Sequence, residues 1–164
     1  MKIRTIFAVI LASLLPAVAT AATVTRILDG DTLDVRENSG LIRVRLVGID
    51  APEKSQPFGQ RAKQQLIELV SNATDVEIKS TGTDRYGRTL ANVWVKKCQP
   101  QCQMYFINEE MVKDGMAWAY RYHGKATSQV MENLESSARV AKVGLWSMPG
   151  ALEPWRFRKS EKHH

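Results

Sequence analysis

Acidic residues that could hold a divalent cation occur in two short runs of the chain. Asp31 follows the turn Asp29-Gly30, and Asp50 and Glu53 flank Ala51-Pro52. Because Asp-Gly is a strong hairpin signal, the first run taken alone favours a plain turn. Asp31 also begins the next predicted strand, however, so its carboxylate can project from a rigid element. Two such carboxylates and a backbone carbonyl are hard oxygen donors that suit Ca²⁺ or Mg²⁺.

Arginine residues accompany these acids. Arg43 and Arg45 lie on one face of a predicted strand, opposite its apolar residues, and this face could equally be a solvated basic surface. Arg88 ends the run 84–88, which taken alone would be a polar loop with a turn glycine. Guanidinium groups bind phosphate oxygens through paired hydrogen bonds. The basic residues could therefore bind a phosphate group beside the acidic residues.

Together the clusters contain what phosphodiester cleavage requires. A divalent ion can neutralise phosphate charge and bind water, a carboxylate can orient or deprotonate that water, and guanidinium groups can hold the charge that develops on the phosphate. We therefore interpret one set of residues as a hydrolytic centre: Asp31, Arg45, Asp50, Glu53 and Arg88.

The elements that would position these residues follow from the apolar pattern. Alternating apolar residues separated by turn signals predict a three-strand meander between residues 24 and 47. Further elements are predicted as a helix at 59–70, strands at 76–80 and 90–95, a short helix at 108–115 beginning near Asn108 as its cap, an extended segment at 116–122 and a helix at 128–141. We expect an α+β fold, a five-stranded OB-type β-barrel with three α-helices.

Cys98 and Cys102 are the only cysteines, and Pro100 lies between them. A zinc site would need further Cys or His nearby, but the three histidines are remote or in the tail. Strand-like sequence on both sides favours a disulfide that clamps the neck of a hairpin, with two unpaired thiols as the alternative.

The N-terminal residues 1–21 have the pattern of a signal peptide. Lys2 and Arg4 form a basic start, residues 6–18 are almost wholly apolar, and residues 19–21 supply a small-x-small cleavage pattern. The apolar run is shorter than the roughly 20 residues of a membrane-spanning helix. We expect export and no membrane association of the mature form; the alternative is a buried core helix.

The remaining chain is the size of one domain. We expect this domain at residues 22–148, followed by a basic, loosely ordered tail at 149–164. Loss of Lys2 and Arg4 would remove two positive charges from the formal net charge of +6 and leave +4. This surplus fits a polyanionic partner but would also fit any basic soluble protein.

Several runs of the chain resemble the staphylococcal nuclease (thermonuclease) family, in its order and spacing. The resemblance covers about residues 23–147. The signature runs are 28–32 (Leu-Asp-Gly-Asp-Thr), 45–53 (Arg-Leu-Val-Gly-Ile-Asp-Ala-Pro-Glu) and 84–91 (Asp-Arg-Tyr-Gly-Arg-Thr-Leu-Ala), and the later landmarks are 107–112, 115–117 and 144–147. The resemblance implies a nuclease whose site contains one Ca²⁺ ion, with Mg²⁺ less favoured.

The same resemblance implies residue roles. Asp31 and Asp50 match the calcium-binding carboxylates, and the backbone carbonyl of Ala51 matches the third protein ligand, a position where the family often has threonine. Glu53 matches the proposed general base, whose role is debated because it could only position water. The remaining matches are Arg45 and Arg88, which correspond to the two phosphate-clamping arginines.

The resemblance also implies a substrate pocket. Tyr86 matches a residue near the terminal phosphate, and Tyr120 and Tyr122 match tyrosines that line the nucleotide pocket. Aromatic residues at alternate positions are equally ordinary in a strand, and base stacking would contribute about 1–3 kcal/mol for each base. His123 is interpreted as a surface residue.

The leading hypothesis is a periplasmic or secreted endonuclease or exonuclease that acts on DNA and RNA with little sequence preference. The family resemblance implies 3′-phosphate products, and no obligate protein partner is evident. One alternative is a non-catalytic OB-fold module that binds nucleic acid, although such relatives lack several of the acids and arginines retained here. Another is a phosphodiesterase that acts on lipids or small nucleotides.

Overall fold

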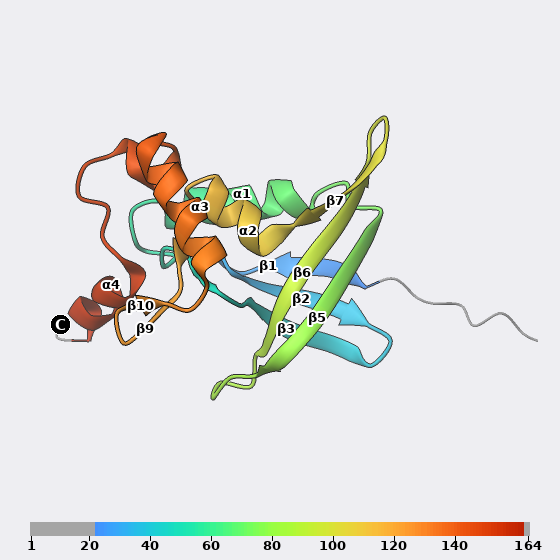
Figure 1. Ribbon diagram of the computed structural model, residues 1–164. Helices are drawn as coiled ribbons and strands as arrows, with labels where there is room; N and C mark the ends of the chain where they lie inside the picture. The colour runs from blue at the N-terminus through green and yellow to red at the C-terminus, as the bar shows by residue number, and fades with distance from the viewer. Residues whose placement is uncertain (1–21, 163–164) are drawn as a thin grey trace, which may run out of the picture.

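A computed structural model describes residues 22–162 of the chain, so the expected signal peptide at 1–21 lies outside the described residues (Figure 1). The strands are β1 Thr23–Ile27, β2 Thr32–Glu37, β3 Gly40–Leu46, β4 Ile49–Asp50, β5 Asp75–Thr83, β6 Thr89–Cys98, β7 Cys102–Phe106, β8 Trp118–Ala119, β9 Arg121–Tyr122 and β10 Lys125–Ala126. The helices are α1 Gly59–Val70, α2 Ile107–Lys113, α3 Gln129–Val140, the 3₁₀ turn η1 Gly144–Ser147 and α4 Pro154–Glu161.

A six-stranded sheet is formed by β1, β2, β3, β5, β6 and β7. Strands β1, β2 and β3 form the predicted antiparallel meander, and β3 then pairs in parallel with the start of β6, where Leu46 faces Ala91. Strand β5 pairs with β6 along its length, so β3 and β7 share the opposite edge of β6. This arrangement brings the end of β3 beside the β5–β6 turn.

The core lies between the inner face of the sheet and the helices α1 and α2 (Figure 1). Alternate strand residues and one stripe of each helix are buried, as the period of two in a strand and 3.6 in a helix requires. The largest of these side chains include Leu33, Val44, Leu46, Val93, Val95, Leu66, Ile107 and Met111. The predicted helix at 59–70 is confirmed as α1.

The fold is α+β, as predicted, but the barrel is not closed. Within residues 22–162 no backbone pairing joins β1 to β5, so the sheet stays open where an OB-type barrel would close. The structure also has a sixth sheet strand, β7, and four α-helices where three were predicted. Strands β5 and β6 run further than expected, which shortens the polar link to residues 84–88. The pairing partner decides these lengths, and local composition does not reveal it.

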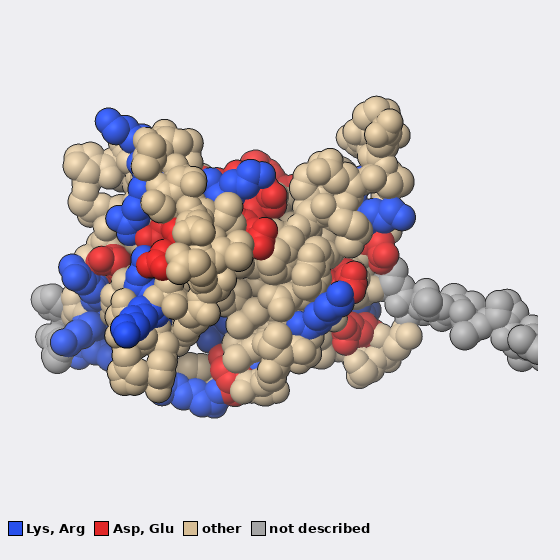
Figure 2. All heavy atoms as spheres, viewed as in Figure 1, with Lys and Arg blue, Asp and Glu red and all other residues tan. Residues whose placement is uncertain are grey.

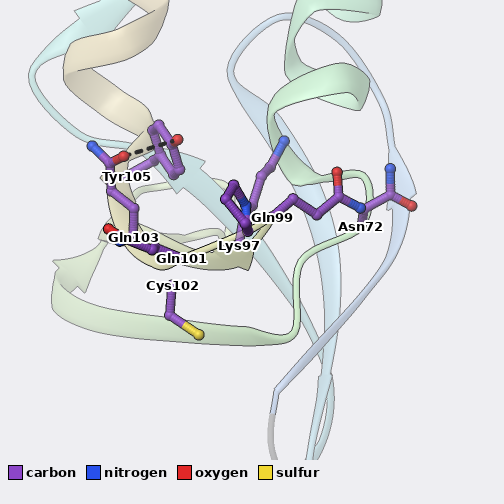
Figure 3. A pocket seen from close by; sticks show the side chains of 8 residues that line it. Asn72, Lys97, Gln99, Gln101, Cys102, Gln103 and Tyr105 are labelled. Atoms are coloured by element: carbon purple, nitrogen blue, oxygen red, sulfur yellow. Dashed lines mark hydrogen bonds between the residues drawn. The ribbon is translucent and has the colours of Figure 1, made fainter.

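A disulfide joins Cys98 and Cys102 at the end of the β6–β7 hairpin, as predicted. The hairpin projects from the sheet at the opposite end of the molecule from α4 (Figure 1). Beside the end of this hairpin lies a polar pocket of about 620 Å³, whose lining includes Lys97, Gln99, Gln103 and Tyr105 (Figure 3). The Tyr105 hydroxyl donates to the amide oxygen of Gln103 at 3.2 Å. None of the predicted catalytic, metal-binding or substrate-binding residues lines this pocket.

The C-terminal residues contain a helix where sequence analysis expected a loosely ordered tail. Helix α4 begins with Pro154 at its first turn, a favoured position because proline lacks the N–H that a first turn leaves unpaired. Pro154 is also buried. Among residues 22–162, no helix combines the length and apolar character needed to cross a membrane.

Candidate active site

Asp31 is held at the turn between β1 and β2. Its backbone N–H donates to the side chain of Asp29 at 3.0 Å, and Thr32 donates its hydroxyl to Asp31 Oδ1 at 3.1 Å. Gly30 is required here by close packing, because a Cβ would lie 2.7 Å from Ala62 Cβ and 2.8 Å from Ala51 Cβ. The glycine therefore lets the turn approach α1 and the loop that follows β4.

Arg45 links the two predicted metal carboxylates. Its Nη2 lies 3.0 Å from Asp31 Oδ2 and 3.1 Å from Asp50 Oδ1, while Nη1 donates to the carbonyls of Leu46 and Ile49 at 2.7 and 3.0 Å. The Arg45 side chain is 12% exposed. Four contacts of this kind would be difficult to form in another rotamer, so Arg45 fixes where the two acids meet.

Asp50 and Glu53 come from β4 and the loop after it. Strand β4 pairs with β8, where Asp50 faces Trp118. Past β4, Ala51 donates its N–H to Asp31 Oδ2 at 2.8 Å, which brings the loop against the first carboxylate. The backbone N–H of Glu53 donates to the side chain of Gln56 at 3.1 Å, and the Glu53 side chain is 37% exposed at the rim of the site.

The two carboxylates at the bottom of the site are electrostatically unfavourable. Burial raises the pKa of Asp31, with the charge of Arg45 opposing it and that of Asp29 adding to it. Burial also raises the pKa of Asp50, against the hydrogen bond from Arg158, and the neighbouring Asp31 raises it further. Burial and neighbouring carboxylates thus oppose the charged form of both acids, a cost that a bound cation would offset.

Arg88 reaches the same place from the β5–β6 turn. Asp84 Oδ1 accepts the backbone N–H groups of Tyr86 and Arg88, and its Oδ2 accepts from Arg88 Nε at 2.8 Å. Burial would raise the pKa of Asp84, but these hydrogen bonds outweigh it and lower the pKa. Arg88 Nη1 then lies 3.5 Å from the Thr32 hydroxyl, which itself donates to Asp31.

These donors fit a hard divalent cation. Asp31 and Asp50 are 6% and 1% exposed, share Arg45 and lie beside Ala51, whose carbonyl is the third oxygen that the family resemblance implies. Within residues 22–162, no three His, Cys, Asp or Glu side chains form a metal cluster. The protein donors for a cation would therefore be two carboxylates and a backbone oxygen, with water completing the shell.

Arg158 is a site residue that sequence analysis did not find. This residue of α4 donates from Nη1 to Asp50 Oδ1 at 3.1 Å and from Nη2 to Asp50 Oδ2 at 2.8 Å. Nη1 also donates to Glu53 Oε1 at 2.7 Å. Burial would lower the pKa of Arg158, but the hydrogen bonds and charges of these acids raise it. The basic composition of the tail was visible in the sequence, but its partner was not.

The predicted pocket tyrosines are all exposed. Tyr86 lies near the guanidinium groups of Arg85 and Arg88, which stand 4.9 and 5.6 Å from its ring centre. The backbone N–H of Tyr120 donates to Gly48 O at 2.9 Å, just before β4, so this residue lies beside the strand that carries Asp50. Tyr122 is in β9 and packs edge-on against His123. The structure thus connects Tyr86 and Tyr120 to site elements, whereas Tyr122 lies in the β9–β10 hairpin.

Two buried polar residues hold the surrounding elements together. Asn108 does not cap α2 as predicted; its side chain accepts from Val93 N and donates to Val47 O and Ala91 O, which joins α2 to β6 and to the turn before β4. Glu135 of α3 accepts from the backbone N–H of Ala119 in β8, the strand that pairs with β4. Both contacts support the frame around Asp50.

Comparisons with known proteins find similarity to nucleases. A family model described as staphylococcal nuclease homologue matches residues 43–148, which include Arg45, Asp50, Glu53 and Arg88. A micrococcal nuclease of Shigella flexneri is 50% identical over 142 residues, covering 85% of this chain and 81% of the relative. Protein ParB of Escherichia coli is 49% identical, with 85% and 80% covered. An uncharacterised endonuclease of Haemophilus influenzae is 44% identical, with 85% and 73% covered.

Proposed function

Since the chain belongs to the staphylococcal nuclease homologue family, we propose that it is an exported, Ca²⁺-dependent nuclease that hydrolyses DNA and RNA with little sequence preference. The observation that carries this proposal is the meeting of two buried carboxylates, from different elements, on one guanidinium group of Arg45. Such an arrangement suits a site that binds a cation and a phosphate together.

The chain's own residues divide the work as follows. Arg45, held by the carbonyls of Leu46 and Ile49, orients Asp31 and Asp50 toward one position. When bound there, a divalent cation supplies Lewis-acid stabilisation of the phosphate charge. Glu53 stands at the solvent-facing rim, where its carboxylate orients the attacking water or accepts its proton.

Arg88 holds the charge that develops on the phosphate. Asp84 holds its Nε, and its Nη1 lies 3.5 Å from the hydroxyl of Thr32, which donates to Asp31. A guanidinium group placed in advance stabilises the transition state without reorganising when the reaction occurs. Tyr86, exposed beside Arg88, is the proposed neighbour of the terminal phosphate, and Tyr120 and Tyr122 are the proposed stacking surface.

The substrate range and the products follow from the same contacts. Phosphate contacts and stacking read no base edges, so DNA and RNA are both proposed substrates. We infer 3′-phosphate ends from the family resemblance. Export to the periplasm or the medium is supported by the N-terminal pattern and by the disulfide, since disulfides persist in oxidising compartments.

Incubation with single-stranded DNA, duplex DNA and RNA tests the proposal, with Ca²⁺, Mg²⁺ or excess chelator present in separate reactions. We expect cleavage of all three substrates with Ca²⁺ and none with chelator. Glu53→Gln should reduce turnover by about 100-fold or more, whereas Glu77→Gln, an exposed acid of β5, is the matched control. Cleavage in excess chelator would contradict the proposed dependence on Ca²⁺. Absence of cleavage in every reaction would favour a non-catalytic module that binds nucleic acid.

A further inference from the structure

Helix α4 places a positive charge inside the candidate active site. Both oxygens of Asp50 accept from Arg158, and Arg158 also donates to Glu53. Asp50 is almost completely buried, at 1% exposed. Helix α4 begins after residue 148, where the family match ends. The guanidinium group at Asp50 and Glu53 therefore comes from a segment that lies outside the matched part of the chain.

Helix α4 is docked by contacts that are independent of Arg158. The side-chain amide of Gln56, a buried residue in the loop after Glu53, donates to Leu152 O. Pro154 is buried, and the guanidinium carbon of Arg121 lies 5.6 Å from the ring centre of Trp155. These contacts come from two different segments of the chain and hold α4 in place without Arg158.

The guanidinium group and a bound cation need the same oxygens. A divalent cation would bond carboxylate oxygens at about 2.0–2.6 Å, and both oxygens of Asp50 already accept from Arg158 at 2.8 and 3.1 Å. Bidentate arginine–carboxylate pairs are among the stronger charge-assisted contacts. The two positive charges would also repel one another at this distance. Occupation by one therefore disfavours the other.

We propose that α4 is an autoinhibitory plug: in the cation-free protein Arg158 occupies the acidic centre, and cation binding displaces it. The proposal rests on the proposed function, because it requires Asp50 to be a cation ligand. The coupling is reciprocal by thermodynamic necessity. If Arg158 weakens cation binding, then the cation loosens the docking of α4 by the same factor.

Calcium titration calorimetry of the purified protein, without nucleic acid, tests the competition. Arg158→Ala should bind Ca²⁺ at least about fivefold more tightly than the wild type. Arg156→Ala is the matched control: it removes the same charge from the same helix, and Arg156 pairs only with Glu153 at 3.2 Å among the ion pairs of the described residues. The control should bind Ca²⁺ with the wild-type affinity.

Amide hydrogen exchange over Pro154–Glu161 of the wild type provides a second readout that needs no variant. Saturating Ca²⁺ should accelerate exchange in α4 and leave α3 unchanged. Equal or weaker Ca²⁺ affinity of Arg158→Ala, an equal gain in Arg156→Ala, or unchanged exchange in α4 would overturn the plug alone. If neither the wild type nor Arg158→Ala bound Ca²⁺, the calcium dependence proposed above would fail together with the plug.

Discussion

The family resemblance implies phosphate clamping for both Arg45 and Arg88, but their surroundings in the structure differ. Arg45 is 12% exposed, donates hydrogen bonds to two backbone carbonyls and forms ion pairs with Asp31 and Asp50. Arg88 is 29% exposed and is held chiefly by Asp84, four residues away in the same turn. Arg45 is thus part of the structural frame of the site, whereas Arg88 is held within a single local turn.

The two alanine variants should therefore separate activity from stability. Arg88→Ala is expected to reduce kcat/KM by about 100-fold or more and to lower the free energy of unfolding by no more than about 1 kcal/mol, because its ion pair is partly exposed. Arg45→Ala should lose activity and also about 3 kcal/mol of stability, since it removes a buried charge partner from both Asp31 and Asp50 and a donor from two carbonyls.

Thermal denaturation and kinetics on DNA measure both effects. Arg85→Ala, next to Tyr86 in the same turn, serves as a control that removes a neighbouring charge. Equal stability of the Arg45 and Arg88 variants would contradict the structural role that the geometry gives to Arg45.

At the scale of elements, the position of β4 depends on contacts made by α3. Glu135 is 2% exposed and accepts from Ala119 N at 2.8 Å, from Arg121 at 2.9 and 3.0 Å, and from Arg139 at 2.9 and 2.7 Å. Because β8 contains Ala119 and pairs with β4, this carboxylate joins α3 to the strand that presents Asp50.

Glu135→Gln should lower the free energy of unfolding by about 3 kcal/mol at neutral pH. Burial would raise the pKa of Glu135, but Arg121, the Ala119 N–H and Arg139 outweigh it and lower the pKa below its ordinary value of 4.5. The contribution is therefore complete above pH 4.5 and is lost as pH falls through the lower, folded-state pKa.

Urea denaturation at neutral pH and at several values below pH 4.5 checks this prediction. The difference between wild type and Glu135→Gln should narrow as the solution becomes more acidic. Glu132→Gln, an exposed acid of the same helix, should show no such difference at any pH. A gap that stayed constant with pH would show that Glu135 contributes through packing and not through its charge.

Elements with a repeating apolar pattern could be predicted, whereas contacts between distant segments could not. Helix α1 follows from the spacing of Ala62 and Leu66, and the disulfide from Cys98 and Cys102. The contact between Arg158 and Asp50 joins residues 108 positions apart, so no local pattern encodes it. The same holds for Asn108, which the sequence predicts as a cap: its partners lie in β6 and in the turn before β4.

Over the whole molecule, basic side chains gather near the candidate site. Figure 2 shows lysine and arginine residues over α4 and the β9–β10 hairpin, the side of the molecule from which Arg158 enters the acidic centre. The formal net charge of the chain is +6. A basic surface that continues outward from the candidate site would hold the phosphates of a bound nucleic acid on either side of it.

Nucleic-acid binding should therefore weaken as the salt concentration rises. The slope of log affinity against log salt should depend on which lysine side chain is removed. For duplex DNA held in excess chelator, which prevents cleavage under the proposed mechanism, Lys159→Gln or Lys125→Gln should each reduce the slope of log affinity against log salt by about 0.9. These lysines belong to α4 and β10. Lys79→Gln makes the same change in net charge within β5, where Lys79 pairs with Glu77, and it should leave the slope unchanged.

Fluorescence anisotropy over a salt series measures the slope for all three variants. An equal fall for Lys79→Gln would mean that total charge, and not the surface around α4, determines binding.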